Sequence, residues 1–353
     1  MRKPTLRDVA RAAGVSYATA DRVLNARGGV AAGSEQRVRQ AIADLGYVRD
    51  LHAANLSRGR VYRFVFVLPR GDHSFFQALR SAVEAQALQC RADRISISVQ
   101  EVPALDPGAL AAALRATSTE VDCLAVVATE APEIAAALTD LRQRGLPVVT
   151  LVGDAAPDLR AAYAGIDNRM AGRTAGRLLA LAHTSREGQI LPVLGAFRAR
   201  DHRDRFDGAA AVFTEAGSKL RLLPAIEVQD RPEVMRKRLS DALAEAANAG
   251  EAVTGIYSIG AGNRGLIDVL EGLEGPRPVV VLHELTPVSR AGLECGLIDA
   301  VIDQKPAEEV ALAIAAMKAL ADGRCPEDVA RAIVPAIYLP DNLPGAGATG
   351  GTP

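Results

Sequence analysis

The sequence has 353 residues, of which 49% are hydrophobic and 24% charged, so we expect two or three domains with apolar cores and exclude disorder of the whole chain. Lys and Arg number 41 against 42 Asp and Glu, and this net charge of −1 alone argues against a nucleic-acid partner. The charges are unevenly distributed, however: residues 1–60 carry 11 basic and 5 acidic side chains, a net +6, and the rest of the chain carries −7. This asymmetry indicates a basic, nucleic-acid-binding head on an acidic body.

The N-terminus enters a charged helical pattern without an apolar segment, and no uncharged apolar run is long enough to span a bilayer. We therefore expect no signal peptide and no membrane span, and a cytoplasmic location. The cysteines at 90, 123, 295 and 325 show no metal-ligand spacing, so we expect buried free thiols, no metal and no cofactor.

Residues 1–48 have the pattern of three short helices. Thr5 offers an N-cap hydroxyl to the first helix, and Ser16 caps a second helix after a tight turn at Gly14. A third helix is expected from Ser34, ending at Gly46 as a C′ glycine. Helices joined by such a turn form a helix-turn-helix arrangement.

From residue 61 onward, apolar strands alternate with Ala- and Leu-rich helices, which is typical of parallel sheets covered on both faces. About ten strands are too many for one such sheet, so we expect two α/β lobes with a cleft between them. The expected strands are residues 62–68, 95–99, 123–128, 147–152, 162–166, 189–194, 220–227, 255–259, 278–282 and 300–302. The domains are then 1–48, a linker 49–60, the body 61–339 and a disordered tail 340–353.

The second helix of the head has the features of a DNA recognition helix. Its outward positions are Tyr17, Ala18, Asp21 and Arg22, while Thr19 and Asn25 are placed to reach phosphates. Arg22 can donate two hydrogen bonds to a guanine, which contributes about 1–3 kcal/mol of base discrimination. The alternative is an ordinary Ala-rich helical cap with Arg22 as a surface charge.

Residues 4–25 (PTLRDVARAAGVSYATADRVLN) resemble the N-terminal signature of the lactose-repressor (LacI/GalR) family of bacterial transcription regulators, and the similarity extends through 38–47 and 53–60. The resemblance implies that Tyr17, Ala18 and Arg22 contact bases. Asp21 departs from the Ser that is usual in the family, and an anion there would repel a phosphate; it could accept instead from cytosine N4.

Composition alone makes residues 49–60 a flexible tether. The resemblance implies a hinge helix that folds on DNA and inserts Leu56 into the minor groove, where an apolar wedge bends the duplex. Packing of Leu56 on its own body domain is the alternative.

In parallel α/β sheets, ligands bind at the carboxyl ends of the strands. The side chains expected there include Asp72, Phe75, Phe76 and Glu130. The two aromatic rings could stack on a sugar, although burial in the core is the more frequent fate for one of them. This inventory suits a neutral, hydroxyl-rich ligand.

The body also resembles the periplasmic sugar-binding fold that the family shares, through Asp167-Asn168, residues 203–208, Gly262-Asn263 and residues 299–304. The resemblance implies that Arg205, Glu284 and Gln304 contact the ligand, together with Asn263. Glu284 and Asn263 stand where Asp is common in the family, so we expect the pocket to differ in reach and charge. The identity of the effector therefore cannot be transferred from a particular member of the family.

Two other classes compete. Gly260-Ala261-Gly262-Asn263-Arg264-Gly265 is a GxGxxG between a strand and a helix, with Glu284 about 20 residues later, which is the context of a nicotinamide-dependent oxidoreductase. A secreted solute-binding protein fits the body but not the basic head. No catalytic triad is legible, so we do not expect an enzyme.

We interpret the chain as a helix-turn-helix head on a two-lobed, periplasmic-binding-protein-like α/β body. We expect the chain to be a transcription regulator, specifically a repressor. As a homodimer, it would bind a near-palindromic operator in double-stranded DNA. A sugar, polyol or sugar acid would shift its operator affinity. Induction and corepression both stay open.

Overall fold

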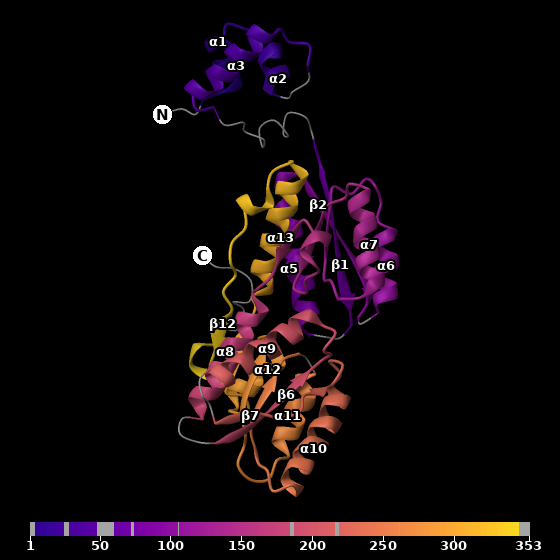
Figure 1. Cartoon of the computed structure of the whole chain (residues 1–353), viewed down its shortest axis with the longest axis vertical. Coiled ribbons are helices and arrows are strands. Elements are labelled where there is room, and N and C mark those ends of the chain that lie inside the picture. Colours follow the sequence, from indigo (N-terminus) through magenta and orange to yellow (C-terminus); the bar gives the residue numbers. More distant parts are fainter. Residues whose placement is uncertain are drawn as a thin grey trace. The chain divides into compact units, whose positions relative to one another are not determined.

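The computed structural model describes residues 4–24, 28–47, 60–71, 74–104, 106–183, 187–215, 219–260 and 262–345. The chain divides into two compact units, Met1–Arg60 and Val61–Pro353, drawn in Figure 1, which we call the head and the body. The predicted site residues Asn25, Leu56 and Asp72 lie outside the described residues, as does the linker up to residue 59.

Three helices form the head: α1 (Leu6–Ala12), α2 (Tyr17–Leu24) and α3 (Ala32–Asp44). Their apolar faces enclose a small core built from Val9, Ala10, Ala13, Ala20, Val23, Val38 and Ala41. Gly14 and Gly46 have φ angles of +61° and +57°, which a glycine adopts without steric cost in the turns after α1 and α3. The third helix begins two residues before the predicted Ser34.

The first lobe of the body holds a parallel sheet of order β2-β1-β3-β4-β5. Alternate residues of β1 point to opposite faces, so Phe64 and Phe66 pack toward α5 and α13, whereas Val67 packs toward α6 and α7 (Figure 1). The elements of this lobe are β1 (Tyr62–Arg70), α5 (Ser74–Cys90), η1 (Arg91–Asp93), β2 (Ile95–Pro103), α6 (Pro107–Arg115), β3 (Cys123–Val126), α7 (Pro132–Gln143), β4 (Val148–Leu151), η2 (Pro157–Leu159), β5 (Ala162–Ala164) and α13 (Pro306–Ala321).

The second lobe holds a sheet of order β12-β11-β10-β9-β6-β7, with β8 paired to β6. All its pairs are parallel except β11 with β12. Its elements are α8 (Asn168–Ala182), β6 (Gly188–Leu194), α9 (Arg200–Glu215), β7 (Leu220–Leu222), β8 (Ile226–Glu227), α10 (Pro232–Asn248), β9 (Val253–Ser258), α11 (Asn263–Glu271), β10 (Val279–His283), α12 (Pro287–Glu294), β11 (Ala300–Asp303), β12 (Ala336–Tyr338) and η4 (Pro340–Asn342). The short helix η3 (Pro326–Asp328) follows α13 and packs against it in the first lobe.

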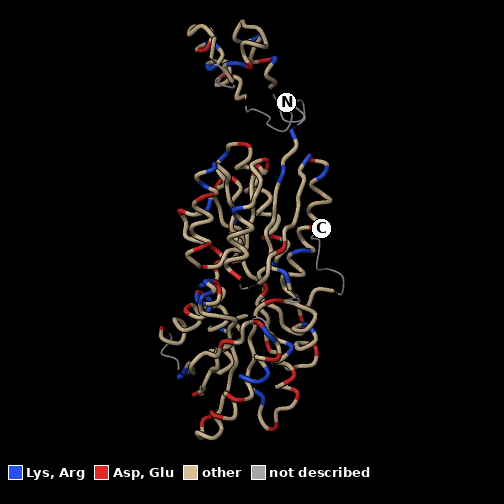
Figure 2. Tube along the Cα trace, turned by 90° about the vertical axis from the view of Figure 1, so that its right-hand side faces the viewer, with Lys and Arg blue, Asp and Glu red and all other residues tan. Residues whose placement is uncertain are grey.

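The chain passes between the lobes three times, before α8, before α13 and before β12. Ile166 and Ile333, on the first and third of these crossings, form a parallel β-bridge. The two lobes are therefore held by short crossing segments. Basic and acidic residues are interspersed along both lobes (Figure 2).

Four sequence expectations need correction. The predicted strand 220–227 is split into β7 and β8, because Pro224 has no N–H to donate to a ladder. The edge strand β12 was not predicted; it has only three residues. The tail is ordered through Gly345, where the Pro344 carbonyl accepts from Arg290 Nη2 at 2.6 Å. All four cysteines are free thiols, but Cys295 and Cys325 are exposed rather than buried.

Within the described ranges, no helix has the length and apolar character needed to cross a bilayer. Across the same residues, no His, Cys, Asp and Glu side chains gather as a group that could hold a metal ion.

Candidate functional site

Helix α2 presents a polar outer face in the head. The Thr19 N–H donates to Ser16 Oγ at 3.1 Å, so the predicted cap of this helix is confirmed. Tyr17 is 54% exposed, and Ala18 and Arg22 are exposed beside it, whereas Thr19 and Asp21 are half-buried. The side chains placed to meet a groove are therefore those of Tyr17, Ala18 and Arg22.

The hydroxyls of Thr5 and Ser16 cap the N-termini of α1 and α2. Thr5 Oγ1 accepts from the Asp8 N–H, and the Thr5 N–H donates to Asp8 Oδ2 at 2.8 Å, which completes a capping box at the start of α1. Thr5 Oγ1 also donates to Asp8 Oδ2 at 2.6 Å. Ser16 Oγ also lies 2.8 Å from Thr19 Oγ1. Any contact of these groups with DNA is additional to capping.

The body contains a cavity of about 570 Å³ between its two lobes, at the carboxyl ends of the strands in both sheets. Its volume lies in the range typical of small-molecule sites. The first lobe lines it with residues that follow β1, β2, β3 and β4, and the second lobe with the loops that follow β6, β8, β9 and β10.

Strained backbone is concentrated at this cavity. Four lining residues other than glycine have positive φ angles: Val152 (63°), Gln229 (53°), Asp230 (56°) and Glu284 (74°). For a β-branched residue such as Val152 this conformation is a genuine outlier. Strain of this kind costs about 1–3 kcal/mol per residue and clusters at functional sites. The cavity is thus the functional site of the body that the geometry favours.

A buried polar network lies behind the cavity, centred on Arg205 of α9, which is 2% exposed. Its Nε donates to Asn168 Oδ1 at 2.7 Å, and its Nη1 donates to the Ile259 carbonyl at 3.2 Å. The same guanidinium contacts Glu284 Oε1 at 3.5 Å and Gln304 Oε1 at 3.4 Å. Gln304 Nε2 in turn donates to Glu284 Oε1 at 2.7 Å.

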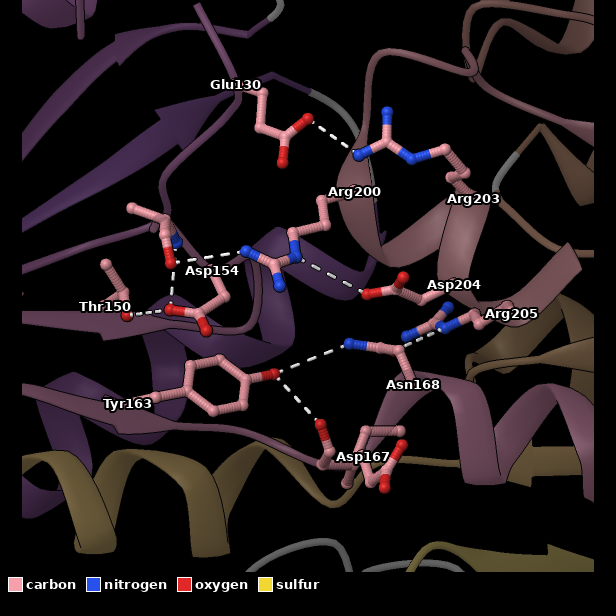
Figure 3. Close-up of polar contacts among 12 residues, drawn as sticks. Glu130, Thr150, Asp154, Tyr163, Asp167, Asn168, Arg200, Arg203, Asp204 and Arg205 are labelled. Carbon is pink, nitrogen blue, oxygen red and sulfur yellow. Dashed lines mark hydrogen bonds and ion pairs between the residues drawn. The ribbon is translucent and has the colours of Figure 1, made fainter. Parts of the chain in front are cut away.

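This network continues into the first lobe, as Figure 3 shows. Asn168 Nδ2 donates to the Tyr163 hydroxyl at 3.4 Å, and that hydroxyl lies 2.9 Å from the carbonyl oxygen of Val152. A change at Arg205 can therefore reach the strained residue at the end of β4.

Glu284 is the member of this network that also lines the cavity. Burial raises the pKa of its carboxyl to about 8, an effect that nearby Arg205 only partly offsets. Its Oε2 atom is buried and has no hydrogen-bond partner among the described residues. A ligand group in the cavity could supply the missing partner.

Four predicted ligand contacts are placed away from the cavity. The Phe75 side chain is 5% exposed and belongs to the apolar core, because it lies on the inner side of α5. Glu130 pairs with Arg203 of the other lobe at 2.7 Å. Arg205 and Gln304 do not line the cavity either, because they pack behind Glu284.

Phe76, Asn263 and Glu284 do line the cavity, as predicted ligand contacts would. The amide oxygen of Asn263 accepts one hydrogen bond, from Ser258 Oγ at 2.7 Å. The amide NH2 offers two donors, and the oxygen keeps one further lone pair.

Sequence reasoning missed the loop between β8 and α10, which contributes Gln229, Asp230 and Arg231. The available signal was a polar run ending at Pro232, a proline at the first turn of a helix.

The glycines of Gly260-x-Gly262-x-x-Gly265 allow close packing. A Cβ atom on Gly265 would lie 2.0 Å from the Pro232 carbonyl oxygen, and one on Gly260 would lie 2.7 Å from Asp230 Oδ1. Gly262, with φ +86°, precedes α11. The spacing is thus explained by the contact of α11 with α10 and with the cavity loops.

Comparisons with known proteins agree with this division. The profile of the family described as bacterial regulatory proteins, lacI family, matches residues 5–50, and that of the periplasmic binding protein domain matches residues 64–325. The HTH-type transcriptional regulator DegA of Bacillus subtilis is 27% identical over 61% of this chain and 62% of DegA, so the match spans less than two thirds of that relative.

The sucrose operon repressor of Vibrio alginolyticus is 50% identical over 15% of this chain and 55% of the repressor. Among solved structures, an ABC transporter solute binding protein from Burkholderia graminis, in complex with D-arabinose, has a TM-score of 0.72. It is 17% identical, with 81% of this chain and 97% of that protein covered. This likeness shows the fold, as predicted. The body of the chain belongs to the periplasmic binding protein domain family, and the head, over residues 5–50, is a DNA-binding segment of the type described as bacterial regulatory proteins, lacI family.

Proposed function

We propose that this chain is a transcription regulator, and a repressor, whose affinity for operator DNA is set by a small hydroxylated effector between the lobes of its body. The observation that carries the proposal is the presence, on one chain, of a basic helix-turn-helix head and of an interlobe cavity lined by strained backbone. The cytoplasm is the compartment in which such a protein would act.

In the head, the exposed face of α2 enters the major groove. Arg22 forks onto a guanine, Tyr17 and Ala18 contact neighbouring base edges, and Thr19 with Thr5 and Ser16 lies near phosphates. Asp21 accepts from a cytosine amino group. Asn25 and Leu56, from outside the described residues, complete the interface, with Leu56 as the minor-groove wedge.

Two heads bind one operator. Helix α2 has only eight residues and contacts too few base pairs for discrimination across a genome, so a homodimer on a near-palindromic site supplies the missing specificity. A net charge of +6 on residues 1–60 of each copy also makes binding dependent on salt.

In the body, the effector is a sugar, polyol or sugar acid. Its hydroxyls meet Glu284 and the Asn263 amide, and its apolar C–H surface faces Phe76. The solved relative with D-arabinose and the repressor of a sucrose operon support this class. Because the cavity is lined from both lobes, the effector favours one arrangement of the two lobes over others. In a dimer, this shift changes the relative position of the two linkers, residues 49–60 of each copy.

The test has two stages on the full chain. Selection from a random DNA pool is expected to yield a near-palindromic site whose affinity falls with salt, and absence of any preferred sequence would refute the regulator function. Fluorescence anisotropy with the selected site, with and without each member of a panel of sugars, polyols and sugar acids, then identifies the effector and the sign of its action. Sedimentation of the complex counts the protein copies.

A further inference from the structure

The two walls of the cavity differ in chemistry. The wall from the first lobe is mainly apolar, with Phe76, Val102, Leu110, Val127 and Val152 among its residues. These side chains come from α5, from α6 and from the ends of β2, β3 and β4. A ligand part that contacts this wall gains free energy by removing its own apolar surface from water.

The wall from the second lobe is mainly polar: it carries the carboxyl groups of Asp201, Asp230 and Glu284, the guanidinium groups of Arg231 and Arg264, and amide, imidazole and hydroxyl side chains. The buried Oε2 of Glu284 has no partner in the described part of the chain. Hydroxyl groups of a ligand are the donors and acceptors that fit such a wall.

A monosaccharide without a substituent has hydroxyls around its whole ring, and the first lobe offers hydrogen-bond partners to few of them. Among the described residues, the polar side chains in its wall are Arg70, Ser74, Asp106 and Thr129, and Asp106 Oδ1 already accepts from the Ala109 N–H at 2.9 Å to cap α6. Hydroxyls turned to this wall would lose hydrogen bonds to water without replacement, which is costly.

The size and the aromatic content of the cavity point the same way. About 570 Å³ is the volume of a site for a drug-sized molecule, which is larger than one sugar ring. Among the described residues that line it, Phe76 is the single Phe, Tyr or Trp, so these residues do not hold a ring between two such aromatic faces.

From these observations we infer that the effector is amphiphilic: a sugar or polyol head faces the second lobe, and an aryl or alkyl substituent lies against the apolar wall of the first lobe. This inference rests on the proposed function, because it assigns a chemical class to the same effector.

The first experiment compares matched ligands by isothermal titration calorimetry on the full wild-type chain. The probes are the methyl and phenyl β-glycosides of D-glucose, D-galactose, D-xylose and L-arabinose. For at least one sugar, the phenyl glycoside is expected to bind about tenfold or more tightly than the methyl glycoside, since it buries a ring of apolar surface.

Equal affinity within every pair that binds would overturn the amphiphilic effector and leave the proposed regulator intact. No binding by any member would overturn both the sugar effector and this inference. A phenyl preference in calorimetry without any change in operator affinity would instead support the amphiphilic site and count against the proposed regulation.

The second experiment changes the apolar wall without changing its shape. Val102→Thr combined with Val127→Thr exchanges two methyl groups for hydroxyls, and is expected to reduce the phenyl-to-methyl affinity ratio about threefold or more. Val334→Thr is the matched control, because Val334 is 63% exposed and lies outside the cavity. An unchanged ratio in the double variant, with a melting temperature that shows it is folded, would overturn the inference.

Discussion

The Glu130 carboxylate and the Arg203 guanidinium form an ion pair of 2.7 Å that joins the two lobes of the body, Glu130 from the loop after β3 and Arg203 from α9 (Figure 3). One turn earlier on α9, Arg200 Nη1 donates to the Ala155 carbonyl of the first lobe at 3.4 Å. Helix α9 thus carries both the buried Arg205 network and contacts that span the cleft. Separation of the lobes has to break these contacts.

Loss of this ion pair is predicted to weaken effector binding. Glu130→Gln removes the charge but keeps the shape, so the arrangement with adjacent lobes loses one stabilising contact. Both side chains are about 40% exposed, and ion pairs at such positions contribute at most about 1 kcal/mol. We therefore expect the effector Kd, measured by calorimetry, to rise roughly two- to fivefold.

Glu215→Gln is the matched control for that change. Glu215 pairs with Arg173 at the same distance of 2.7 Å, but both residues lie within the second lobe, on α9 and α8. The effector Kd of this variant is expected to equal that of the wild type. An equal effect of both variants would mean that the charge matters and the lobe-to-lobe contact does not.

Arg205→Ala is predicted to destabilise the body. The substitution leaves the buried oxygens of Asn168 and Gln304 without their guanidinium donor and removes a contact of the buried Glu284 carboxyl, and each buried polar group left unpaired costs about 1–3 kcal/mol. Chemical denaturation measures the loss. Arg173→Ala, at an exposed position, is expected to leave the denaturation midpoint near that of the wild type.

The same variant tests the role of Arg205 in the response. If Arg205→Ala protein remains folded, its operator affinity without effector is expected to stay near normal, since the head folds around a core of its own. The effector-induced shift in that affinity is expected to disappear. A variant that still responds fully would show that the network behind Glu284 does not transmit ligand binding.

Stability of the body is predicted to fall as the pH rises toward 9. Because burial raises the folded-state pKa of Glu284 to about 8, from an ordinary value of 4.5, the folded protein prefers the protonated carboxyl. The stabilisation is fully present below pH 4.5 and is lost as the pH rises through 8. Its full size is on the order of a few kcal/mol.

Glu284→Gln isolates this effect, because an amide cannot ionise. The free energy of unfolding of Glu284→Gln, measured without effector between pH 5 and 9, is expected to vary less than that of the wild type. Burial also raises the pKa of Glu309, so some dependence of the same sign remains. Identical pH profiles for variant and wild type would refute the assignment to Glu284.

In the head, Arg22→Ala is predicted to weaken specific binding to the selected operator by about 1–3 kcal/mol, roughly a fivefold to hundredfold rise in Kd, and to relax the preference at one base pair of each half-site. Arg39→Ala on α3, which removes an exposed Arg paired with Glu35, is the control and is expected to leave that preference unchanged. Both variants are compared by anisotropy at one salt concentration.

The organisation of the chain could be predicted from the sequence because its signals are local. The cap at Ser16, the glycine turn and the apolar spacing of α2 specify the head within a few turns of helix. The strands of the body are recognisable in the sequence as apolar runs. The cavity lies at the carboxyl ends of these strands, where ligand sites of parallel sheets are expected.

The depth of individual side chains was decided only by the tertiary structure. Phe75 and Phe76 are neighbours in sequence, yet one packs in the core and the other lines the cavity, because adjacent helical positions point in different directions. Glu130 follows a strand as a ligand contact would, but Arg203 lies 73 residues later and pairs with it across the cleft.

Sequence alone therefore determined the two units, their order and the charged head, through patterns repeated every two to four residues. Which polar groups meet each other was decided by packing. Arg205 binds Asn168, Glu284 and Gln304, at separations of 37 to 99 residues, because the packing of α8 and α9 on the second sheet brings these side chains to the ends of its strands. No local period carries such information, since the contacts exist only once the second lobe has formed.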